Sequence, residues 1–248
     1  MKLFSATWPA PNKIKTLITT RQGGFSLPPF DSFNLALHVE DKPEHVEQNR
    51  QLLTKKLPAS PTWLDQQHTI NCINIDNQKF KQPSVADASL TTKMNSICVV
   101  LTADCMPLLV CNKNATIVAA IHAGWKGMVD GIIEKSILQI LTETQESADE
   151  LMVWLGPAIS QNNFEVGLDV KDAFVKKHPK SIDAFKSINN KPDKFLCDLY
   201  QISRLILNHL GVTQIYSENF CTYADKENFY SYRRDGQTGR MASLIWME

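Results

Sequence analysis

The chain has 248 residues, of which 43% are hydrophobic, and its 26 Lys and Arg residues are matched by 26 Asp and Glu residues. A chain of this length and hydrophobic content can bury a large core. The balanced charge provides no overall attraction to nucleic acid or to an anionic membrane surface, so the composition does not favour either as a partner.

The sequence lacks the usual signs of secretion or membrane insertion. No apolar run reaches the roughly 18 residues that a membrane-spanning helix needs. Residues 1–15 have neither a long apolar core nor a small-residue cleavage site, so we expect no signal peptide. The six cysteines are scattered, with no CxxC pair and no dense disulfide framework. We therefore expect a cytoplasmic protein with reduced cysteines.

The N-terminal region predicts a strand over residues 16–21 that ends at Arg21 and runs into a Gly-Gly loop. This loop is either an ordinary turn, since glycine tolerates positive φ, or an anion site made by Arg21 and exposed backbone N–H groups. A helix is predicted over 44–57, with Pro43 suited to its first turn. His38 and His45 have no partner at ligand spacing, and we interpret both as surface or loop histidines.

Two polar residues precede the most apolar part of the chain. His68 follows the apolar pair Trp63-Leu64 at a point where the sequence turns abruptly polar, as at the end of a strand. A single histidine in such a place is more often structural or solvated than a ligand. Asp87 either orients a ligand imidazole or caps a turn, and the sequence leaves both interpretations open.

Residues 96–127 are the stretch around which the chain is organised. Aliphatic and β-branched residues predict buried strands over 99–101, 107–111 and 116–121. If Lys113-Asn114 forms a two-residue turn, the second and third strands make a hairpin. Cys105 would then lie opposite His122, with Cβ atoms about 4.5–5.5 Å apart.

The remainder of the chain mixes strands and helices without strict alternation. A helix over 128–143 would point its N-terminus at Cys105 and His122. The other predicted elements are a strand over 151–155, helices over 165–177 and 195–210, and strands over 212–216, 229–232 and 242–246. The arginines of residues 233–240 lie either on a solvated hairpin tip or in a second anion-binding loop. The pattern predicts an α+β protein, with mixed sheets flanked by helices in one domain over 1–248.

The pairing of Cys105 with His122 supports three interpretations. Thiolate and imidazole are good ligands for zinc or copper, and His68 is then the best candidate for the third ligand. Alternatively, Cys105 is a nucleophile with His122 as its base. The third interpretation is a buried cysteine and a satisfied histidine on a packed hairpin.

The chain resembles the YfiH family, also called laccase-domain proteins. The words that carry the resemblance include TTRQGGFS, FNLALHVED, QQH, TADCMPLL, IHAGWKG and FYSYRRDGQTGRMA, in this order from residue 19 to 242. The resemblance implies a zinc-type site made by His68, Cys105 and His122 in a single domain of mixed α/β layers. The chain departs from the family pattern at Thr69, where the family's usual Q-V-H-G has glycine. It also departs at Lys126, because HAGW is commonly followed by arginine in the family.

The resemblance also implies phosphorolysis of purine nucleosides (adenosine, inosine or methylthioadenosine) and deamination of adenosine, for which zinc sites with His and Cys ligands activate water. A nucleoside and phosphate would be the small-molecule partners of a monomer or homodimer. Our candidates for binding phosphate are Arg21 first, then Arg234 and Arg240. Six histidines are too few for a blue copper together with a trinuclear cluster, although one copper could occupy the single site.

Three alternatives stay open. The first is a cysteine hydrolase, such as an amidase that edits peptidoglycan precursors, with Cys105 as nucleophile. The second is a polyphenol oxidase that uses one copper. The third is a metal-binding regulatory protein without turnover.

Overall fold

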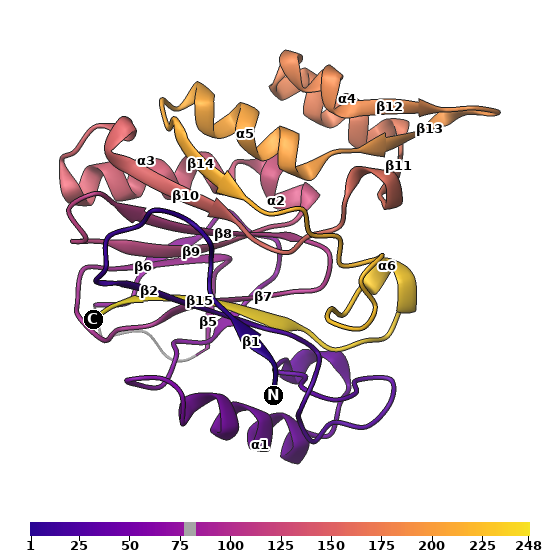
Figure 1. The fold of residues 1–248 in the computed structure, drawn as a ribbon. Helices are drawn as coiled ribbons and strands as arrows, with labels where there is room; N and C mark the ends of the chain where they lie inside the picture. Colours follow the sequence, from indigo (N-terminus) through magenta and orange to yellow (C-terminus); the bar gives the residue numbers. More distant parts are fainter. Residues whose placement is uncertain (77–82) are drawn as a thin grey trace.

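Two β-sheets packed face to face form the centre of the molecule (Figure 1). The computed structural model describes residues 1–76 and 83–248. The larger sheet has the strand order β14 (Gln214–Ser217), β10 (Leu151–Leu155), β8 (Met106–Asn112), β9 (Val118–Ala123), β6 (Ala88–Thr91) and β4 (Cys72–Asn74). The smaller sheet has the order β1 (Leu3–Phe4), β2 (Ile14–Thr19), β15 (Met241–Met247) and β7 (Cys98–Thr102).

The central strands are apolar throughout because both of their faces are covered. In β8, Leu108 and Val110 belong to the apolar cluster under the helices, whereas Leu109 and Cys111 belong to the cluster between the two sheets. Successive side chains of a strand point to opposite faces of the sheet, so alternate residues of β8 pack in two different layers. The central stretch of the sequence is therefore buried on both sides.

Helices cover both outer faces, so the layers run helix, sheet, sheet, helix (Figure 1). Helices α3 (Ile132–Thr144) and α5 (Leu199–His209) pack on the larger sheet. The smaller sheet packs on its outer side against Leu53 of α1 (Pro43–Thr54) and the aromatic and aliphatic residues that precede that helix. The prediction of mixed sheets flanked by helices is confirmed.

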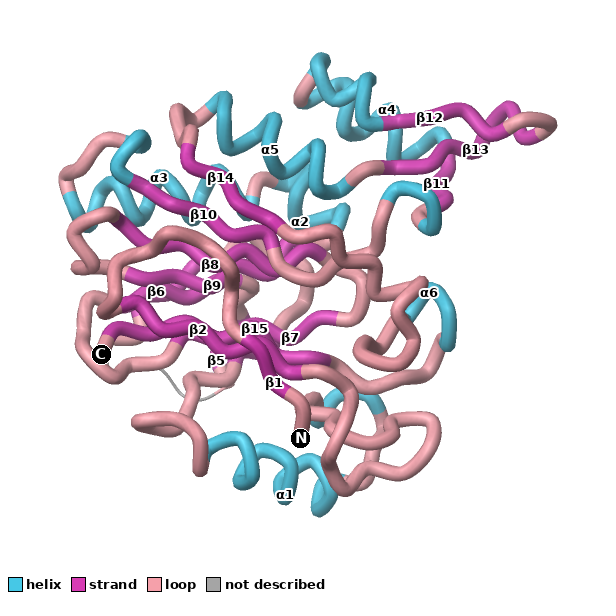
Figure 2. The backbone as a smooth tube through the Cα atoms, viewed as in Figure 1, coloured by secondary structure: helices cyan, strands magenta, loops and turns pink. Residues whose placement is uncertain are grey.

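The remaining elements are short. They are β3 (Leu64–Asp65) paired with β5 (Ser84–Val85), the sheet of β11 (Glu165–Gly167), β13 (Lys191–Cys197) and β12 (Phe185–Ile188), helices α2 (Trp125–Asp130), α4 (Leu168–Lys177) and α6 (Tyr232–Asp235), and 3-10 turns η1 (Leu37–Val39), η2 (Ala148–Glu150), η3 (Gln161–Asn163) and η4 (Pro179–Ala184). Figure 2 shows that much of the chain around α1 and α6 is loop.

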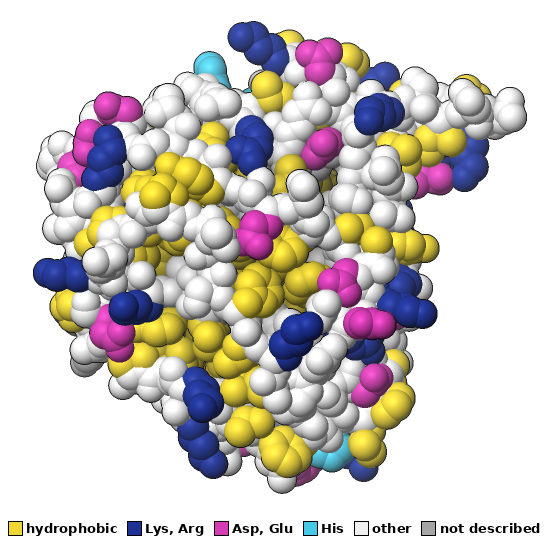
Figure 3. Space-filling view, viewed as in Figure 1, with side chains coloured by type: hydrophobic (Ala, Val, Ile, Leu, Met, Phe, Trp, Pro, Cys, Tyr) yellow, Lys and Arg dark blue, Asp and Glu magenta, His cyan; other side chains and the backbone are white. Residues whose placement is uncertain are grey.

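The surface carries charges of both signs, as the balanced composition predicts. On the face in Figure 3, basic and acidic side chains are interspersed and do not gather into a patch of one sign. None of the described helices is long and apolar enough to cross a membrane.

The predicted register of the β8–β9 hairpin is wrong. The turn spans more than Lys113 and Asn114, because the Asn112 side chain accepts the N–H of Thr116 at 2.9 Å and donates to the Thr116 hydroxyl at 2.7 Å. The strands therefore pair with Pro107 opposite His122. Cys105 therefore lies just before β8, two residues away from the position opposite His122.

Other predicted boundaries also shift for local reasons. Gly131 has a φ of 108° and divides the predicted helix 128–143 into α2 and α3. The Asp198 side chain caps α5 by accepting the N–H of Gln201, so the part of residues 195–210 before that cap belongs to strand β13. The predicted strand 229–232 is wrong, since Ser231 caps the short helix α6 there.

Candidate metal centre

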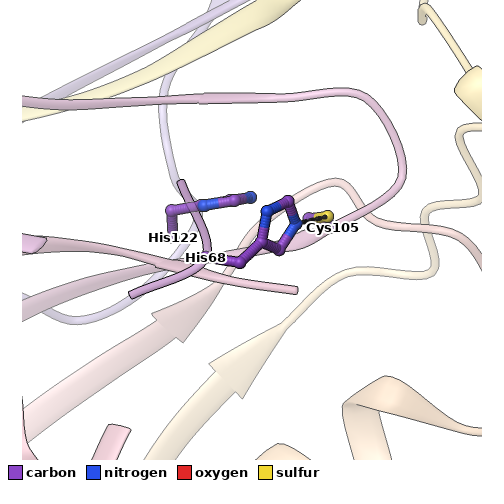
Figure 4. A group of neighbouring side chains, drawn as sticks. All are labelled: His68, Cys105 and His122. Carbon is purple, nitrogen blue, oxygen red and sulfur yellow. Dashed lines mark hydrogen bonds between the residues drawn. The ribbon is translucent and has the colours of Figure 1, made fainter. Parts of the chain in front are cut away.

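His68, Cys105 and His122 converge from three separate segments (Figure 4). His122 lies in β9, Cys105 in the tight turn between β7 and β8, and His68 in the loop after β3. One potential ligand atom from each residue lies within 4.8 Å of the other two. Within the described residues, this is the one group of three or more His, Cys, Asp and Glu side chains placed to hold a metal ion.

Asp87 organises two of the three residues. Its buried carboxylate accepts the backbone N–H groups of Gln67, His68 and Thr69 at 3.3, 3.0 and 2.6 Å, and also the Thr69 hydroxyl at 2.8 Å. Three successive N–H groups around one anion form a nest, and the φ of 57° at His68 is the left-handed conformation that such a nest requires.

The same carboxylate fixes the imidazole of His122. Oδ1 of Asp87 lies 2.7 Å from Nδ1 of His122. Because a carboxylate only accepts, Nδ1 carries the proton and Nε2 is left as a ligand atom. The sequence left two roles open for Asp87, and its geometry fits both, since it orients an imidazole and holds a turn.

The space between the three residues suits a tetrahedral metal ion. Sγ of Cys105 lies 3.7 Å from Nε2 of His68, and ligands on one tetrahedral zinc ion would be about 3.6 Å apart with ordinary zinc–sulfur and zinc–nitrogen distances. Gly124 keeps this space open. A Cβ on Gly124 would lie 2.5 Å from Cδ2 of His68 and 3.0 Å from Sγ of Cys105.

The electrostatics favour a thiolate. Burial raises the pKa of Cys105, but the charge of His122 and hydrogen bonds from both histidines outweigh it and lower the pKa to about 6. Burial lowers the pKa of His122, but Cys105 and Asp87 outweigh it and raise the pKa to about 9. A deprotonated thiol is the form that binds a metal, and a thiolate beside an imidazolium is also the form of a cysteine nucleophile.

A pocket of about 530 Å³ opens over the three residues. This volume is in the range of small-molecule sites. Aromatic side chains line it from three elements, namely Trp125 at the start of α2, Phe164 after η3 and Tyr232 of α6. Trp125 and Tyr232 are also among the exposed large apolar residues of the chain, at 37% and 62%.

The structure separates Arg240 from the other two arginines that the sequence offered as phosphate ligands. Arg21 and Arg234 line a second pocket, where they lie 4.0 and 2.8 Å from Asp235. Arg240 lines the pocket over the candidate metal ligands, together with Arg233. Arg21 lies outside it, where the guanidinium contacts both the backbone oxygen and the carboxylate of Asp31 at 3.0 and 3.4 Å. Arg234 also lies outside and donates to Asp235 and to three backbone carbonyls, which ties α6 to the loop beneath it.

Sequence reasoning missed several residues of the pocket. Arg233 stood in the same loop as Arg234, and nothing in the pattern showed which of the two faced inward. His38 was interpreted as a loop histidine, yet its side chain lines the pocket. The aromatic residues carried no signal, because an isolated Trp, Phe or Tyr near a turn is common in any core.

Comparison with known proteins gives one consistent family. Residues 15–248 match the family model described as multi-copper polyphenol oxidoreductase laccase. The chain is 44% identical over 250 residues to a purine nucleoside phosphorylase of Haemophilus influenzae, with 100% of both chains covered. It is 42% identical over 248 residues to the purine nucleoside phosphorylase YfiH of Escherichia coli, with 99% of both covered.

Solved structures agree with the fold. The crystal structure of Neisseria meningitidis protein NMB0706 superimposes with a TM-score of 0.93 at 43% identity, covering 100% of both chains. That of the hypothetical protein YfiH of Bacillus licheniformis gives a TM-score of 0.90 at 28% identity, covering 96% of this chain and 94% of the other.

Proposed function

Since this chain belongs to the YfiH family, whose model carries the description multi-copper polyphenol oxidoreductase laccase, we propose that it is a metal-dependent purine nucleoside phosphorylase. Its substrates would be inosine, adenosine or methylthioadenosine together with phosphate, and its products a free purine and a pentose 1-phosphate. Adenosine deamination in the same pocket is a second activity. The relatives named above are called purine nucleoside phosphorylases, which supports this substrate class.

The metal would be held by His68, Cys105 and His122, with Asp87 behind them. Three protein ligands and one open position are typical of a catalytic zinc site. A zinc ion there supplies Lewis acidity toward an oxygen of substrate or water. Zinc is favoured over a copper cluster, because within the described residues there is one such group of ligands.

The observation that carries the proposal is an arginine without a carboxylate partner beside these ligands. Arg240 is not in an ion pair with any described residue, and its hydrogen-bonded Nη1 donates to the backbone oxygens of Thr238 and Gly239 at 2.8 and 3.0 Å. Burial lowers the pKa of Arg240, which the charges of Cys105 and Asp104 partly offset. The free edge of its guanidinium suits an anion in the pocket, and phosphate is the anion that phosphorolysis needs.

The aromatic walls fit the other part of the substrate. Nucleobases stack on aromatic side chains, each worth about 1–3 kcal/mol in nucleic-acid complexes. Trp125, Phe164 and Tyr232 offer such faces around the pocket. The Arg233 guanidinium, which also lines the pocket, packs over the Phe164 ring, 5.1 Å from its centroid.

A cysteine hydrolase is the second candidate, favoured by the low pKa of the Cys105 thiol beside His122. The two candidates differ in their need for metal. A hydrolase that uses Cys105 as nucleophile works without metal and is inactivated by alkylation. A phosphorylase that uses Cys105 as a ligand loses activity on chelation and recovers it with zinc.

The test is release of hypoxanthine from inosine by zinc-loaded protein, with and without phosphate. We expect phosphate-dependent release that Cys105→Ala abolishes. Arg240→Gln should raise the KM for phosphate at least tenfold, because a charge-assisted bond to phosphate is lost. Arg21→Gln tests the competing assignment of the phosphate site. Full phosphorolysis by folded Cys105→Ala would refute the proposal.

A further inference from the structure

His38 lies on the wall of the same pocket, although it is far from the metal ligands in sequence. It sits in the 3-10 turn η1 and lines the pocket together with Arg240 and the three candidate ligands. Within the described part of the chain, neither ring nitrogen of His38 has a hydrogen-bond or ion-pair partner. An imidazole that faces a substrate pocket with both nitrogens free is available for proton transfer.

The turn that carries His38 is held by a buried polar network. The carboxylate of Asp41 accepts the hydroxyl of Ser26 at 2.6 Å and the amide of Asn34 at 2.9 Å. Asn49 of α1 donates to Ser26 and to the backbone oxygen of Asn34 at 3.0 and 2.8 Å. All four side chains are at most 7% exposed. Buried polar networks that are fully paired rigidify their surroundings, so η1 is a fixed turn.

The same turn is joined to the loop of Arg240. The Asn34 side chain accepts the backbone N–H of Arg240 at 3.0 Å, and Gln237 donates to the Glu40 carboxylate at 2.9 Å. These two hydrogen bonds lie on either side of His38 in sequence. They place the imidazole and the Arg240 guanidinium on adjoining walls of the pocket, where one bound phosphate can meet both.

The surroundings of His38 favour its neutral form. Burial and the charges of Arg240, Arg50 and His122 lower the pKa of His38, and Asp65 is the one named neighbour that raises it. Asp104 is the one carboxylate among the described residues that line the pocket, and its oxygens already have donors. Asp104 accepts the Thr222 hydroxyl at 2.6 Å and the N–H of Arg233 at 2.7 Å. His68, Cys105 and His122 are assigned to the metal. Among the other side chains that line the pocket, His38 is the one best placed to accept a proton.

We propose that His38 is the general base of phosphorolysis, taking the proton of the phosphate hydroxyl as that oxygen attacks the sugar. This inference rests on the proposed function. As the new C1′–O bond forms, the C1′–N9 bond breaks and its electron pair stays with the purine. The imidazolium then returns the proton to the departing purine. His38 ends neutral, and the proton that left phosphate is on the released purine.

The test compares His38→Gln with wild-type protein in phosphorolysis of inosine, with zinc content and circular dichroism measured on both. Glutamine keeps a hydrogen-bonding side chain but cannot take the proton. We expect kcat to fall about 10²–10⁴-fold, as for loss of a general base, without a comparable rise in the KM for phosphate. Added imidazole should restore part of the rate.

The pH profile separates a base from a structural residue. Wild-type kcat should fall as pH drops through the pKa of His38, below its ordinary value of 6.5, because the protonated form accepts no proton. His38→Gln should lack this acid limb. His209→Gln, which removes an exposed histidine at the end of α5, is the matched control and should keep wild-type kcat and profile.

The outcomes distinguish the two proposals. An active wild-type protein whose His38→Gln variant keeps full kcat and the same acid limb would overturn the role of His38 alone. Wild-type protein that releases no purine from any nucleoside in the presence of phosphate would overturn both. Loss of kcat with normal zinc content, an absent acid limb and rescue by imidazole would support both.

Discussion

Oδ1 of Asp87 lies 2.7 Å from Nδ1 of His122, with both side chains buried. The same carboxylate holds the backbone of the His68 loop through three N–H groups. Asp87, which directly precedes β6, therefore sets the positions of two candidate ligands that are 54 residues apart in sequence. The metal site depends on this carboxylate as much as on the ligands.

Asp87→Asn should weaken zinc binding by about 10–100-fold, the usual cost of losing a carboxylate behind a histidine ligand. The amide has one oxygen acceptor where the carboxylate has two, and it no longer stabilises positive charge on His122. A competition titration with a chromophoric chelator measures the affinity. Asp149→Asn changes an exposed carboxylate and is the control. Equal affinity in Asp87→Asn and wild-type protein would contradict the role given to Asp87.

Thr69 contributes a side-chain hydrogen bond to the nest around Asp87. Its hydroxyl lies 2.8 Å from Oδ2 of Asp87 and accepts the N–H of Asn71 at 3.1 Å. Thr69→Val should lower the free energy of unfolding by about 1 kcal/mol, since the buried carboxylate loses a donor. Thr69→Ser keeps the hydroxyl and should be close to wild type. Denaturant unfolding compares them, and identical stability of the valine and serine variants would show that the hydroxyl is unimportant.

The sequence predicted well those elements whose boundaries are set by residues within or next to them. The predicted strand 151–155 coincides with β10, and the start of α1 followed from Pro43. The hairpin register failed because the Asn112 side chain widens the turn, and one asparagine does not reveal that. The grouping of Cys105 with His122 survived this error, because both residues remain at the same open end of the hairpin.

The sequence alone does not predict which arginine faces the pocket. Arg21 and Arg240 both stand near glycines at a predicted strand end, and the sequence ranked Arg21 above Arg240 as a phosphate ligand. Only the fold shows that Asp31 contacts the guanidinium of Arg21, whereas Arg240 is left without a carboxylate partner among the described residues. Pairing across distant loops is a tertiary property, and the same applies to His38, whose turn meets the Arg240 loop through Asn34.

Gly124→Ala should abolish metal binding while leaving the protein folded. The added methyl group would lie 2.5 Å from Cδ2 and 2.7 Å from Nε2 of His68, so the imidazole must leave its place beside Gly124. Bound zinc, measured by atomic absorption after gel filtration, should drop below one tenth of the protein concentration. Gly127→Ala is the control, since its methyl group would meet Ile132 at an ordinary 3.4 Å. Full zinc occupancy in Gly124→Ala would contradict the geometry.

The thiol of Cys105 should react with iodoacetamide at an unusually low pH in protein stripped of metal. A pKa lowered to about 6 means that the thiolate fraction rises through pH 6, whereas an ordinary thiol of pKa 9.0 ionises three units higher. Buried Cys98 and Cys111, with pKa values raised to about 12, should stay unlabelled at pH 7. Peptide mass spectrometry distinguishes Cys105 from the partly exposed Cys221.

Removing the positive neighbour should weaken this shift. His122→Asn takes away the charge and the hydrogen bond of His122, which lower the pKa of Cys105, and leaves burial opposed by His68 alone. The midpoint of labelling should therefore move to a higher pH than in wild-type protein. Zinc added before the reagent should protect Cys105 in wild-type protein but not in the variant, because His122 is also a ligand. A labelling midpoint near pH 9 in wild-type protein would show that the thiol and imidazole do not interact as their geometry requires.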